Sequence, residues 1–537
     1  MSTNMTNGQA LMQLLQGYGI DTVFGMPGVH TLEYYRGIAD TEMNHVMFRH
    51  EQGGGFMADG YARISGKPAV CCVITGPGVT NIATAVGNAY ADSQPMLVIA
   101  STNATEDLGA GRGRLHEITD QRASIAPLTA FSQTIMHSTS IPSAVSRAFE
   151  VFANSRPRPV HLELPIDKIA EAAEFAADAS PLAGRPMPAP DSIERAAALC
   201  KGAERPVIIA GGGVVDQGDA ILAVAERLGA AVLLTTAAKG AIDEDHALNA
   251  GSGMSSPLVH SFIGESDLVI AVGTELSETD TWVPGFLPIN GNLIRIDIDV
   301  ENLSRDLPPD AAVLGDGGAA LSMLADALSA AANGRGFGDG KAIAALRKAV
   351  IDEAMAGDKA KKHAKVLDSI RAALPDNGWL ITDATQPGYM GNTYYRTSTP
   401  RSYTHPSGYC TLGSAMPSAI GARLGAPDRP GVTLAGDAGF LFTVQELATG
   451  VDEGVSLPII LWNNDGLGQI RDDMIEKDIK TIGVSPRNPD YLALAKAFGA
   501  EAVEPDSLDS LTGAMRDGFT AGRPVLIQVR EDADYLN

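Results

Sequence analysis

Cysteine is scarce in this chain: its 537 residues include only four, Cys71, Cys72, Cys200 and Cys410. Their spacing matches neither a metal-binding motif nor a disulfide framework, so we expect reduced thiols and a cytoplasmic location. Basic side chains are also few, because 40 lysines and arginines stand against 64 aspartates and glutamates, a net charge of −24. This excess of negative charge argues against nucleic acid or an anionic membrane as a partner.

Long apolar runs are missing as well. No uninterrupted apolar stretch approaches the roughly 20 residues that span a bilayer, so we expect no membrane partner. The N-terminus also lacks the basic segment and apolar core of a secretory signal. Hydrophobic residues nevertheless make up 45% of the chain, which is enough for large buried cores. A chain of this length typically forms about three domains.

Short apolar runs alternate with helix-like segments along the whole chain. Runs such as 69–74, 96–100 and 457–462 are typical of buried strands. This alternation predicts an α/β fold with doubly wound parallel sheets. Two loose stretches divide the chain, and the first is rich in alanine and proline. We predict domains at 1–170, 191–330 and 346–537, joined by linkers at 171–190 and 331–345.

The most informative segment runs from Gly436 to Gly468. An apolar strand precedes Gly436-Asp437-Ala438-Gly439, and a second precedes Asn463-Asn464-Asp465-Gly466-Leu467-Gly468. Neighbouring parallel strands bring such residues to the same edge of a sheet, where ligands bind in α/β proteins. Asp437, the amide oxygen of Asn464 and a carbonyl near Gly466 are hard oxygen ligands of the kind that Mg²⁺ prefers. The glycines allow backbone N–H groups to approach a phosphate. The alternative is a tight turn and an asparagine-rich loop without a ligand.

These two segments resemble the GDG…NN signature of thiamine-diphosphate enzymes, with Ala438 in place of the usual third glycine. The resemblance covers nearly the whole chain and is closest to the acetolactate synthase and 2-oxo acid decarboxylase family. It implies a pyrimidine-binding, a central and a diphosphate-binding domain, each with a doubly wound parallel sheet. It further implies thiamine diphosphate and Mg²⁺ as cofactors. The partner of the chain would be another copy, in a homodimer or homotetramer with active sites between subunits.

Glu51 is the main catalytic candidate. It follows a short apolar strand and opens a glycine-rich helix, so we expect it to be buried. In the family this position hydrogen-bonds a ring nitrogen of the cofactor's aminopyrimidine. The alternatives are a glutamate that caps the helix or pairs with Arg49 or His50.

Further cofactor contacts are implied by the resemblance alone. In the family, a large aliphatic residue at the position of Leu412 wedges between the two rings of the cofactor, although a leucine here could equally be core. The backbone of Cys410 would contact the aminopyrimidine. The remaining implied contacts are Gly28, Thr75, Thr385, Gln386, Gly436, Asp437, Ala438, Gly439, Asn464, Gly466, Leu467 and Gly468.

Two histidines are candidates for proton transfer. Acetolactate synthases carry Phe-Gln-Glu where this chain has Leu115-His116-Glu117, and a histidine can act as acid or base near neutrality. His116 could also be an ordinary surface residue, and His30 is a second candidate for the same role. Val29 and Gln121 are the predicted pocket residues beside them.

Asp473 occupies the position of a substrate-selecting tryptophan in acetolactate synthases. A carboxylate there could pair with a cationic substrate tail, and guanidinium is its best planar match. It could instead offset a helix dipole. Segments 28–33, 49–52, 115–117, 469–474 and 486–490 most resemble the branch of the family that decarboxylates 5-guanidino-2-oxopentanoate to 4-guanidinobutanal.

Carboligation of the acetolactate synthase type is the alternative activity. Some relatives hold FAD in the central domain. The cluster Gly211-Gly212-Gly213 alone is weak evidence for a dinucleotide, and no acidic residue at the right place completes that motif. We therefore expect no FAD. Two alternatives come from other classes of protein. An FAD-dependent 2-oxo acid oxidase would be yellow when purified. A regulatory protein would bind thiamine diphosphate without turnover.

Overall fold

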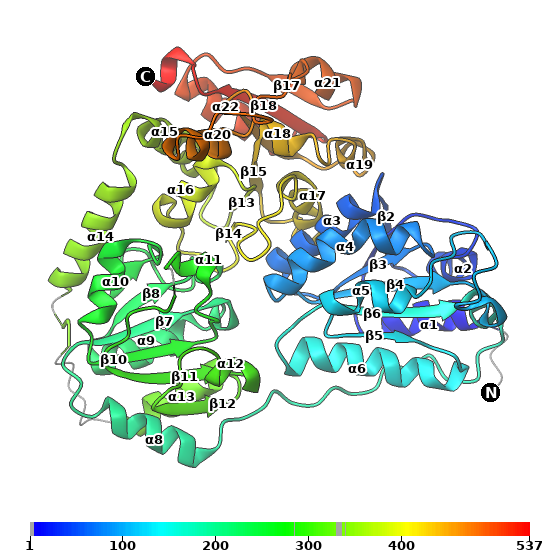
Figure 1. The fold of residues 1–537 in the computed structure, drawn as a ribbon, viewed down its shortest axis with the longest axis horizontal. Helices are drawn as coiled ribbons and strands as arrows, with labels where there is room; N and C mark the ends of the chain where they lie inside the picture. Colours follow the sequence, from blue (N-terminus) through cyan, green and yellow to red (C-terminus); the bar gives the residue numbers. More distant parts are fainter. Residues whose placement is uncertain (1–4, 284, 329–335, 339) are drawn as a thin grey trace.

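The structure, a computed structural model, describes residues 5–283, 285–328, 336–338 and 340–537. Within these ranges it contains three six-stranded sheets, and all strand pairs within them are parallel. Figure 1 shows the three bodies, the first in blue and cyan, the second in green and the third in yellow to red. The predicted α/β class with three doubly wound parallel sheets is therefore confirmed.

The first sheet has the strand order β2-β1-β3-β4-β6-β5. Its strands are β1 (Thr22–Gly25), β2 (Asn44–Met47), β3 (Ala69–Val73), β4 (Met96–Thr102), β5 (Phe131–Thr134) and β6 (Val160–Pro165). Its helices are α1 (Asn7–Gly17), α2 (Leu32–Ala39), α3 (Glu51–Ser65), α4 (Pro77–Ala91), α5 (Gln121–Ile125), α6 (Ile141–Asn154) and α7 (Ile166–Ala170). Strands β3 and β4 are buried along their whole length, which explains their continuous apolar sequences.

The central sheet has the order β12-β11-β10-β7-β8-β9. Its strands are β7 (Pro206–Ala210), β8 (Ala231–Leu234), β9 (Asn249–Gly251), β10 (Leu268–Val272), β11 (Asn292–Asp297) and β12 (Ala311–Leu314). Its helices are α8 (Pro190–Cys200), α9 (Gly218–Leu228), α10 (Pro257–Gly264), α11 (Glu278–Thr281), α12 (Val300–Ser304) and α13 (Gly317–Ala327). This sheet has a hydrophobic core of its own.

The third sheet has the order β14-β13-β15-β16-β18-β17. Its strands are β13 (Trp379–Thr382), β14 (Tyr403–Thr404), β15 (Gly431–Gly436), β16 (Leu457–Asn463), β17 (Glu501–Val503) and β18 (Pro524–Arg530). Helix α14 (Lys341–Ala354) precedes this sheet, and its buried residues Ile343 and Val350 pack in the core of the central sheet. The longer helices of the third sheet are α15 (Asp358–Ala373), α16 (Gln386–Tyr394), α17 (Ala415–Gly425) and α22 (Leu508–Gly518). Its shorter helices are α18 (Asp437–Phe440), α19 (Glu446–Asp452), α20 (Gly468–Glu476) and α21 (Tyr491–Ala497).

The two segments predicted as linkers differ in their secondary structure. Between α7 and α8 the chain forms no helix or named strand, and Figure 1 shows it as a long connection along the bottom of the molecule. In the second predicted linker, residues 331–335 and 339 lie outside the described residues. Residues 341–345 belong to α14, so that part of the linker prediction is wrong. Helix-favouring alanine and lysine residues in this stretch explain the difference.

The first and third sheets share one hydrophobic core, in which α3 packs against α17. The two helices approach so closely that a Cβ at Gly60 would overlap the carbonyl oxygen of Ser418. Likewise, a Cβ at Gly421 would overlap the carbonyl oxygen of Met57. This packing fixes the position of α3, the helix that begins with Glu51. Among the helices of the described ranges, none has the length and apolar character needed to cross a membrane.

Candidate active site

Asp437 lies at the carboxyl end of β15, where it begins the short helix α18. Its side chain is buried, at 1% exposure. The Oδ2 atom accepts hydrogen bonds from Gly466 N at 2.8 Å and from Asn488 Nδ2 at 2.7 Å. The Oδ1 atom accepts one from Ala438 N at 2.8 Å. Burial raises the pKa of Asp437, and these donors oppose that rise.

Asn464 follows the neighbouring strand β16, so the two strand ends bring it to the edge that holds Asp437. Its Nδ2 atom donates to Gln386 Oε1 at 3.1 Å. The amide oxygen of Asn464 takes no part in this hydrogen bond. A Cβ at Gly468 would collide with the same amide group. Gly466 has a φ of +136°, a conformation that favours glycine. The turn therefore requires both glycines of the Gly-Leu-Gly sequence.

The donor set at this edge fits a magnesium ion and a phosphate. Asp437, the Asn464 amide oxygen and the Gly466 carbonyl are oxygen ligands, and Mg²⁺ typically takes one or two carboxylates and completes its shell with phosphate and water. The described residues contain no group of three or more His, Cys, Asp or Glu side chains that could hold a metal, so an all-protein cage is not available. Asn488 adds a buried Oδ1 atom that lacks a hydrogen-bond partner in the described part of the chain. Such an unsatisfied oxygen beside Asp437 favours a further polar group at this place.

Ala438 belongs to the right-handed helix α18 and does not have a positive φ angle. Alanine can therefore replace the third glycine of the GDG pattern without backbone strain. Gly439 is also buried in this helix. Leu467 precedes α20, and its N–H group donates to Val484 O at 2.8 Å.

The loop that carries Cys410 and Leu412 is held by a buried acid at the end of β13. Asp383 is 1% exposed, and its two carboxylate oxygens accept from Gly413 N at 3.1 and 2.9 Å. Burial raises the pKa of Asp383 to about 7. Cys410 has a φ of +49° and Leu412 is half-buried, as expected for a side chain that could contact a ligand. Sequence reasoning placed Asp383 at a strand end but did not assign it this role, because its partner Gly413 lies 30 residues away.

Thr385 and Gln386 lie at the start of α16, at the carboxyl end of β13. Thr385 is buried close to Gly436, with its Oγ1 atom 3.1 Å from where a Cβ of that glycine would lie. Gln386 connects Asn464 to the neighbouring helix, because its Nε2 atom donates to Asp472 Oδ2 at 2.8 Å. The predicted cofactor contacts of the third domain therefore gather at one edge of one sheet.

Glu51 is the first residue of α3 and is buried, at 8% exposure. Its Oε2 atom accepts a hydrogen bond from Asn81 Nδ2 at 3.0 Å. Neither alternative interpretation of Glu51 agrees with the structure. His50 caps the helix by accepting from Gln52 N, and the Arg49 side chain pairs with Asp452. Sequence reasoning missed Asn81, which lies 30 residues further along in α4.

The structure brings the two predicted histidines together. The ring centroids of His30 and His116 are 5.4 Å apart in an edge-to-face arrangement. Among the described residues, neither Nδ1 atom has a hydrogen-bond partner, although both atoms are buried. Burial and the neighbouring His116 lower the pKa of His30. His116 has a φ of +60°, and its carbonyl would collide with a Cβ at Gly76. Two unsatisfied imidazoles side by side are suited to proton transfer.

The remaining predicted residues of the first domain surround this pair. Gln121 Oε1 accepts from Gly76 N at 2.6 Å, and its Nε2 atom donates to Glu163 at 2.7 Å, so Gln121 fixes a turn. Thr75 donates to Ser101 Oγ at 2.9 Å. Gly28 lies where a Cβ would collide with Ile74. Val29 is 64% exposed, which is unusual for an apolar side chain.

Asp473 lies in the second turn of α20 and is half-buried. The first turn of this helix contains no acidic residue, so the interpretation of Asp473 as a first-turn helix charge is wrong. Asp473 Oδ1 accepts from Gln469 Nε2 at 2.9 Å. The adjacent Asp472 is bound by Lys359 at 2.6 Å and by Gln386. Within the described residues, no lysine, arginine or histidine forms an ion pair with Asp473. The acid is therefore available to a cation.

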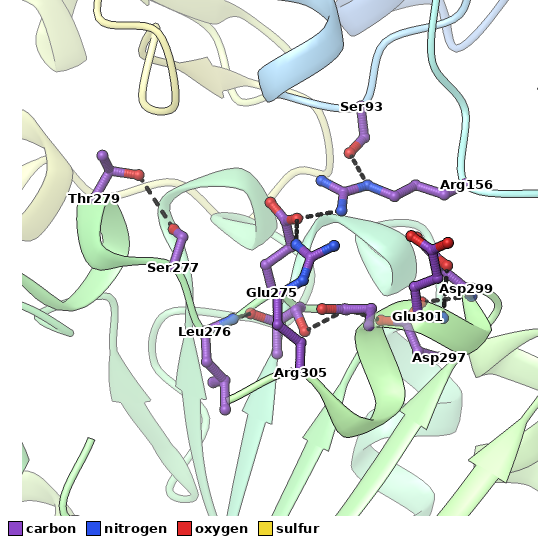
Figure 2. Close-up of polar contacts among 12 residues, drawn as sticks. Ser93, Arg156, Glu275, Leu276, Ser277, Thr279, Asp297, Asp299, Glu301 and Arg305 are labelled. Atoms are coloured by element: carbon purple, nitrogen blue, oxygen red, sulfur yellow. Dashed lines mark hydrogen bonds and ion pairs between the residues drawn. The ribbon is translucent and has the colours of Figure 1, made fainter. Parts of the chain in front are cut away.

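At the corresponding edge of the central sheet, the acidic side chains of Glu275 and Asp297 already have partners. Figure 2 shows Arg156, from the first domain, reaching Glu275 and Ser93. Asp297 accepts from Asn302 Nδ2 at 2.6 Å and from Asp299 N at 2.9 Å. The expectation that FAD is absent stays a prediction.

Comparison with known proteins places these observations in a family. Three family models match in chain order: thiamine pyrophosphate enzyme, N-terminal TPP binding domain (residues 5–124), central domain (193–324) and C-terminal TPP binding domain (383–529). The chain belongs to the thiamine pyrophosphate enzymes. Thiamine diphosphate, the same compound, is accordingly its cofactor. Glu51 lies in the N-terminal cofactor-binding domain and Asp437 in the C-terminal one.

Relatives of this thiamine pyrophosphate enzyme match it over nearly their full length. It is 48% identical to the Probable 2-ketoarginine decarboxylase AruI of Pseudomonas aeruginosa, over 98% of this chain and 94% of that protein. It is 29% identical to the Probable acetolactate synthase large subunit of Methanococcus aeolicus, over 98% and 92% of the two chains. It is 28% identical to the Acetolactate synthase isozyme 1 large subunit of Escherichia coli, over 98% and 94%.

Proposed function

We propose that this enzyme decarboxylates 5-guanidino-2-oxopentanoate, also called 2-ketoarginine, to 4-guanidinobutanal and carbon dioxide. The observation that carries this proposal is the 48% identity to a probable 2-ketoarginine decarboxylase, against 28–29% to the two acetolactate synthases. The substitution of His116 within Leu115-His116-Glu117 supports it, because an added acid favours protonation of the product.

Mg²⁺ is the proposed metal. Asp437, Asn464 and the carbonyl of Gly466 would hold it, and the N–H groups of the two glycine turns would meet the diphosphate. The support is the buried oxygen set at the ends of β15 and β16. When bound, thiamine diphosphate supplies a nucleophilic carbon and an electron sink.

The residues of the chain orient the substrate and move protons. Decarboxylation releases C1 of the oxo acid as carbon dioxide, the bound cofactor would supply the electron sink for the pair left behind, and C2 then needs a proton for the aldehyde to form. Glu51 would hydrogen-bond the aminopyrimidine ring, and Asn81 holds its carboxyl in place. His30 and His116 would supply the proton to C2, since their Nδ1 atoms have no partner among the described residues.

Asp473 is the proposed partner of the guanidinium group. A carboxylate that is half-buried and has no cationic partner in the described ranges matches a planar cation. Val29, which is exposed, would line another part of the substrate pocket, whereas Gln121 would act by holding the turn at Gly76. Because guanidinium stays charged at all physiological pH values, the pairing would not depend on its protonation.

The proposed assembly is a homodimer or homotetramer with active sites between subunits. Within one chain, Glu51 contacts Asn81 in α4, whereas Thr411, beside Leu412, contacts Asn88 in the same helix. Seven residues separate the two contacts, a rise of about 10 Å. Within one chain, Glu51 and the residue before Leu412 therefore contact α4 about two turns apart, and we take this separation as support for completion of each site by a partner subunit.

Exposed apolar side chains support the same assembly. Val29 and Leu115 of the first domain are 64% and 56% exposed, and Phe442 and Ile482 of the third are 54% and 77% exposed. These four side chains are candidates for burial against a partner subunit, as larger apolar patches at interfaces are. A cytoplasmic location is also proposed, and the four cysteines without disulfide bonds support it.

The test is carbon dioxide release from a panel of 2-oxo acids, with thiamine diphosphate and Mg²⁺ added. The panel contains 5-guanidino-2-oxopentanoate, pyruvate, and branched and aromatic acids. Release from the guanidino acid with 4-guanidinobutanal as product is expected. Preference for pyruvate with acetolactate as product would instead assign the carboligase activity of the other relatives.

A further inference from the structure

A buried acid of the third domain reaches into the turn that presents Glu51. Glu446 begins α19 and is fully buried, at 0% exposure. Its Oε1 atom accepts from His50 N at 2.9 Å and Arg49 N at 3.2 Å, and its Oε2 atom accepts from Arg49 N at 3.0 Å. Thr449 orients the carboxylate by donating to Oε2 at 2.8 Å. The two backbone donors are the residues immediately before Glu51.

The contact is close and specific. Gly53, in the first turn of α3, lies against the carboxylate, and a Cβ there would collide with Glu446. Within the described ranges, Glu446 has no lysine, arginine or histidine side chain as an ion-pair partner. Burial raises the pKa of Glu446, and the hydrogen bonds from Arg49, His50 and Thr449 oppose that rise. A buried acid that is satisfied almost wholly by backbone N–H groups fixes the backbone that it binds.

We propose that Glu446 is a positioning residue for Glu51. Its carboxylate anchors the strand-to-helix turn at Arg49 and His50, and so sets where the Glu51 carboxyl meets the aminopyrimidine ring. The proposal rests on the role of Glu51 in the proposed function. It does not depend on which 2-oxo acid is the substrate.

The experiment compares Glu446→Ala and Glu446→Gln with Asp452→Ala. Asp452 is the control because it lies on the same helix but pairs with the side chain of Arg49, not with its backbone. The side chain of Asp452 is 55% exposed. Three quantities are measured on the full-length enzyme with thiamine diphosphate and Mg²⁺. They are the rate of hydrogen–deuterium exchange at C2 of the bound cofactor, kcat and KM for decarboxylation, and the affinity for the cofactor.

Glu446→Ala is expected to lower both the exchange rate and kcat by about 10- to 100-fold, the cost of a misplaced catalytic group. KM and cofactor affinity should change less than about threefold, since the diphosphate edge is untouched. Glu446→Gln should recover most of the loss, because its amide oxygen can still accept from His50 N. Asp452→Ala should behave like the wild type.

An unchanged exchange rate in Glu446→Ala would overturn the proposal, as would an equal loss in Asp452→Ala. If Glu446→Ala does not fold, Thr449→Val provides the second test. It removes one donor from the carboxylate and should lower the exchange rate about two- to fivefold, and no change would again refute the role. Because the exchange needs no oxo acid, a wrong substrate assignment would leave this readout intact.

Discussion

Arg63 lies in α3 between two carboxylates of the first domain, Asp59 and Asp92, and Asp92 also contacts the loop of the third domain that carries Cys410. Its Nε atom is 2.7 Å from Asp59 Oδ2, and its Nη2 atom is 2.7 Å from Asp92 Oδ2. The three side chains are 10%, 2% and 11% exposed. Asp92 in turn accepts from Gly408 N at 2.8 Å, two residues before Cys410. This ion-pair network therefore supports both the core of the first domain and the loop that carries Cys410, a proposed contact of the aminopyrimidine.

Arg63→Met would leave two buried carboxylates without their cation. Removing one partner of a buried pair typically costs about 3–5 kcal/mol. At ~2–4 °C per kcal/mol for a domain of this size, the melting temperature should fall by about 10 °C. The assay is thermal unfolding followed by circular dichroism at pH 7.5, with the cofactor and Mg²⁺ present.

The matched control is Arg195→Met. Arg195 pairs with Asp191 at the same distance of 2.7 Å, but their side chains are 59% and 70% exposed. Exposed pairs of this kind contribute little, so the control should melt at nearly the wild-type temperature. If Arg63→Met shifts the melting temperature no more than the control does, the reasoning about this network is refuted.

Three further predictions follow from the site and its surroundings. Glu51→Gln should lower kcat by at least about 100-fold with an unchanged circular dichroism spectrum, and wild-type turnover would remove its catalytic role. Asp437→Asn should weaken Mg²⁺ binding in calorimetric titrations with thiamine diphosphate present, because it removes the only carboxylate of the proposed set. Burial lowers the pKa of Lys239 from 10.5 to about 8, so the folded state binds its proton less tightly than the unfolded state. Stability should therefore rise with pH between about 8 and 10.5 in the wild type relative to Lys239→Met, measured as the difference in melting temperature; a difference that stays constant or falls with pH would contradict this assignment.

The sheets and their edges could be predicted because they depend on local sequence. Continuous apolar runs such as β3 and β16 predict buried parallel strands, and residues after adjacent strands meet at one edge. Asp437 and Gly466 are joined by a hydrogen bond of 2.8 Å for this reason. The spacing of the glycines around Asn464 likewise indicated a tight turn.

The supporting residues could not be predicted, because tertiary packing brings them in from distant segments. Asn81 reaches Glu51 from another helix, and Glu446 reaches the same region from another domain, 396 residues after His50 in the sequence. Asn488 lay in a segment that the sequence analysis noted, but nothing in its spacing indicated a bond to Asp437. The start of α14 was missed because a loose, glycine-rich stretch immediately precedes it.

The most direct test of the account is the ratio of kcat/KM for 5-guanidino-2-oxopentanoate to kcat/KM for 2-oxooctanoate, a 2-oxo acid of similar length with an uncharged tail. The ratio is measured for the wild type and for Asp473→Asn. A wild-type preference of at least about 100-fold that falls at least tenfold in the variant is predicted, since a carboxylate–guanidinium pair in a partly buried site contributes roughly 1.5–3 kcal/mol. Equal use of the two acids by the wild type would contradict the proposed substrate, and a preference that survives in Asp473→Asn would contradict the role of this residue.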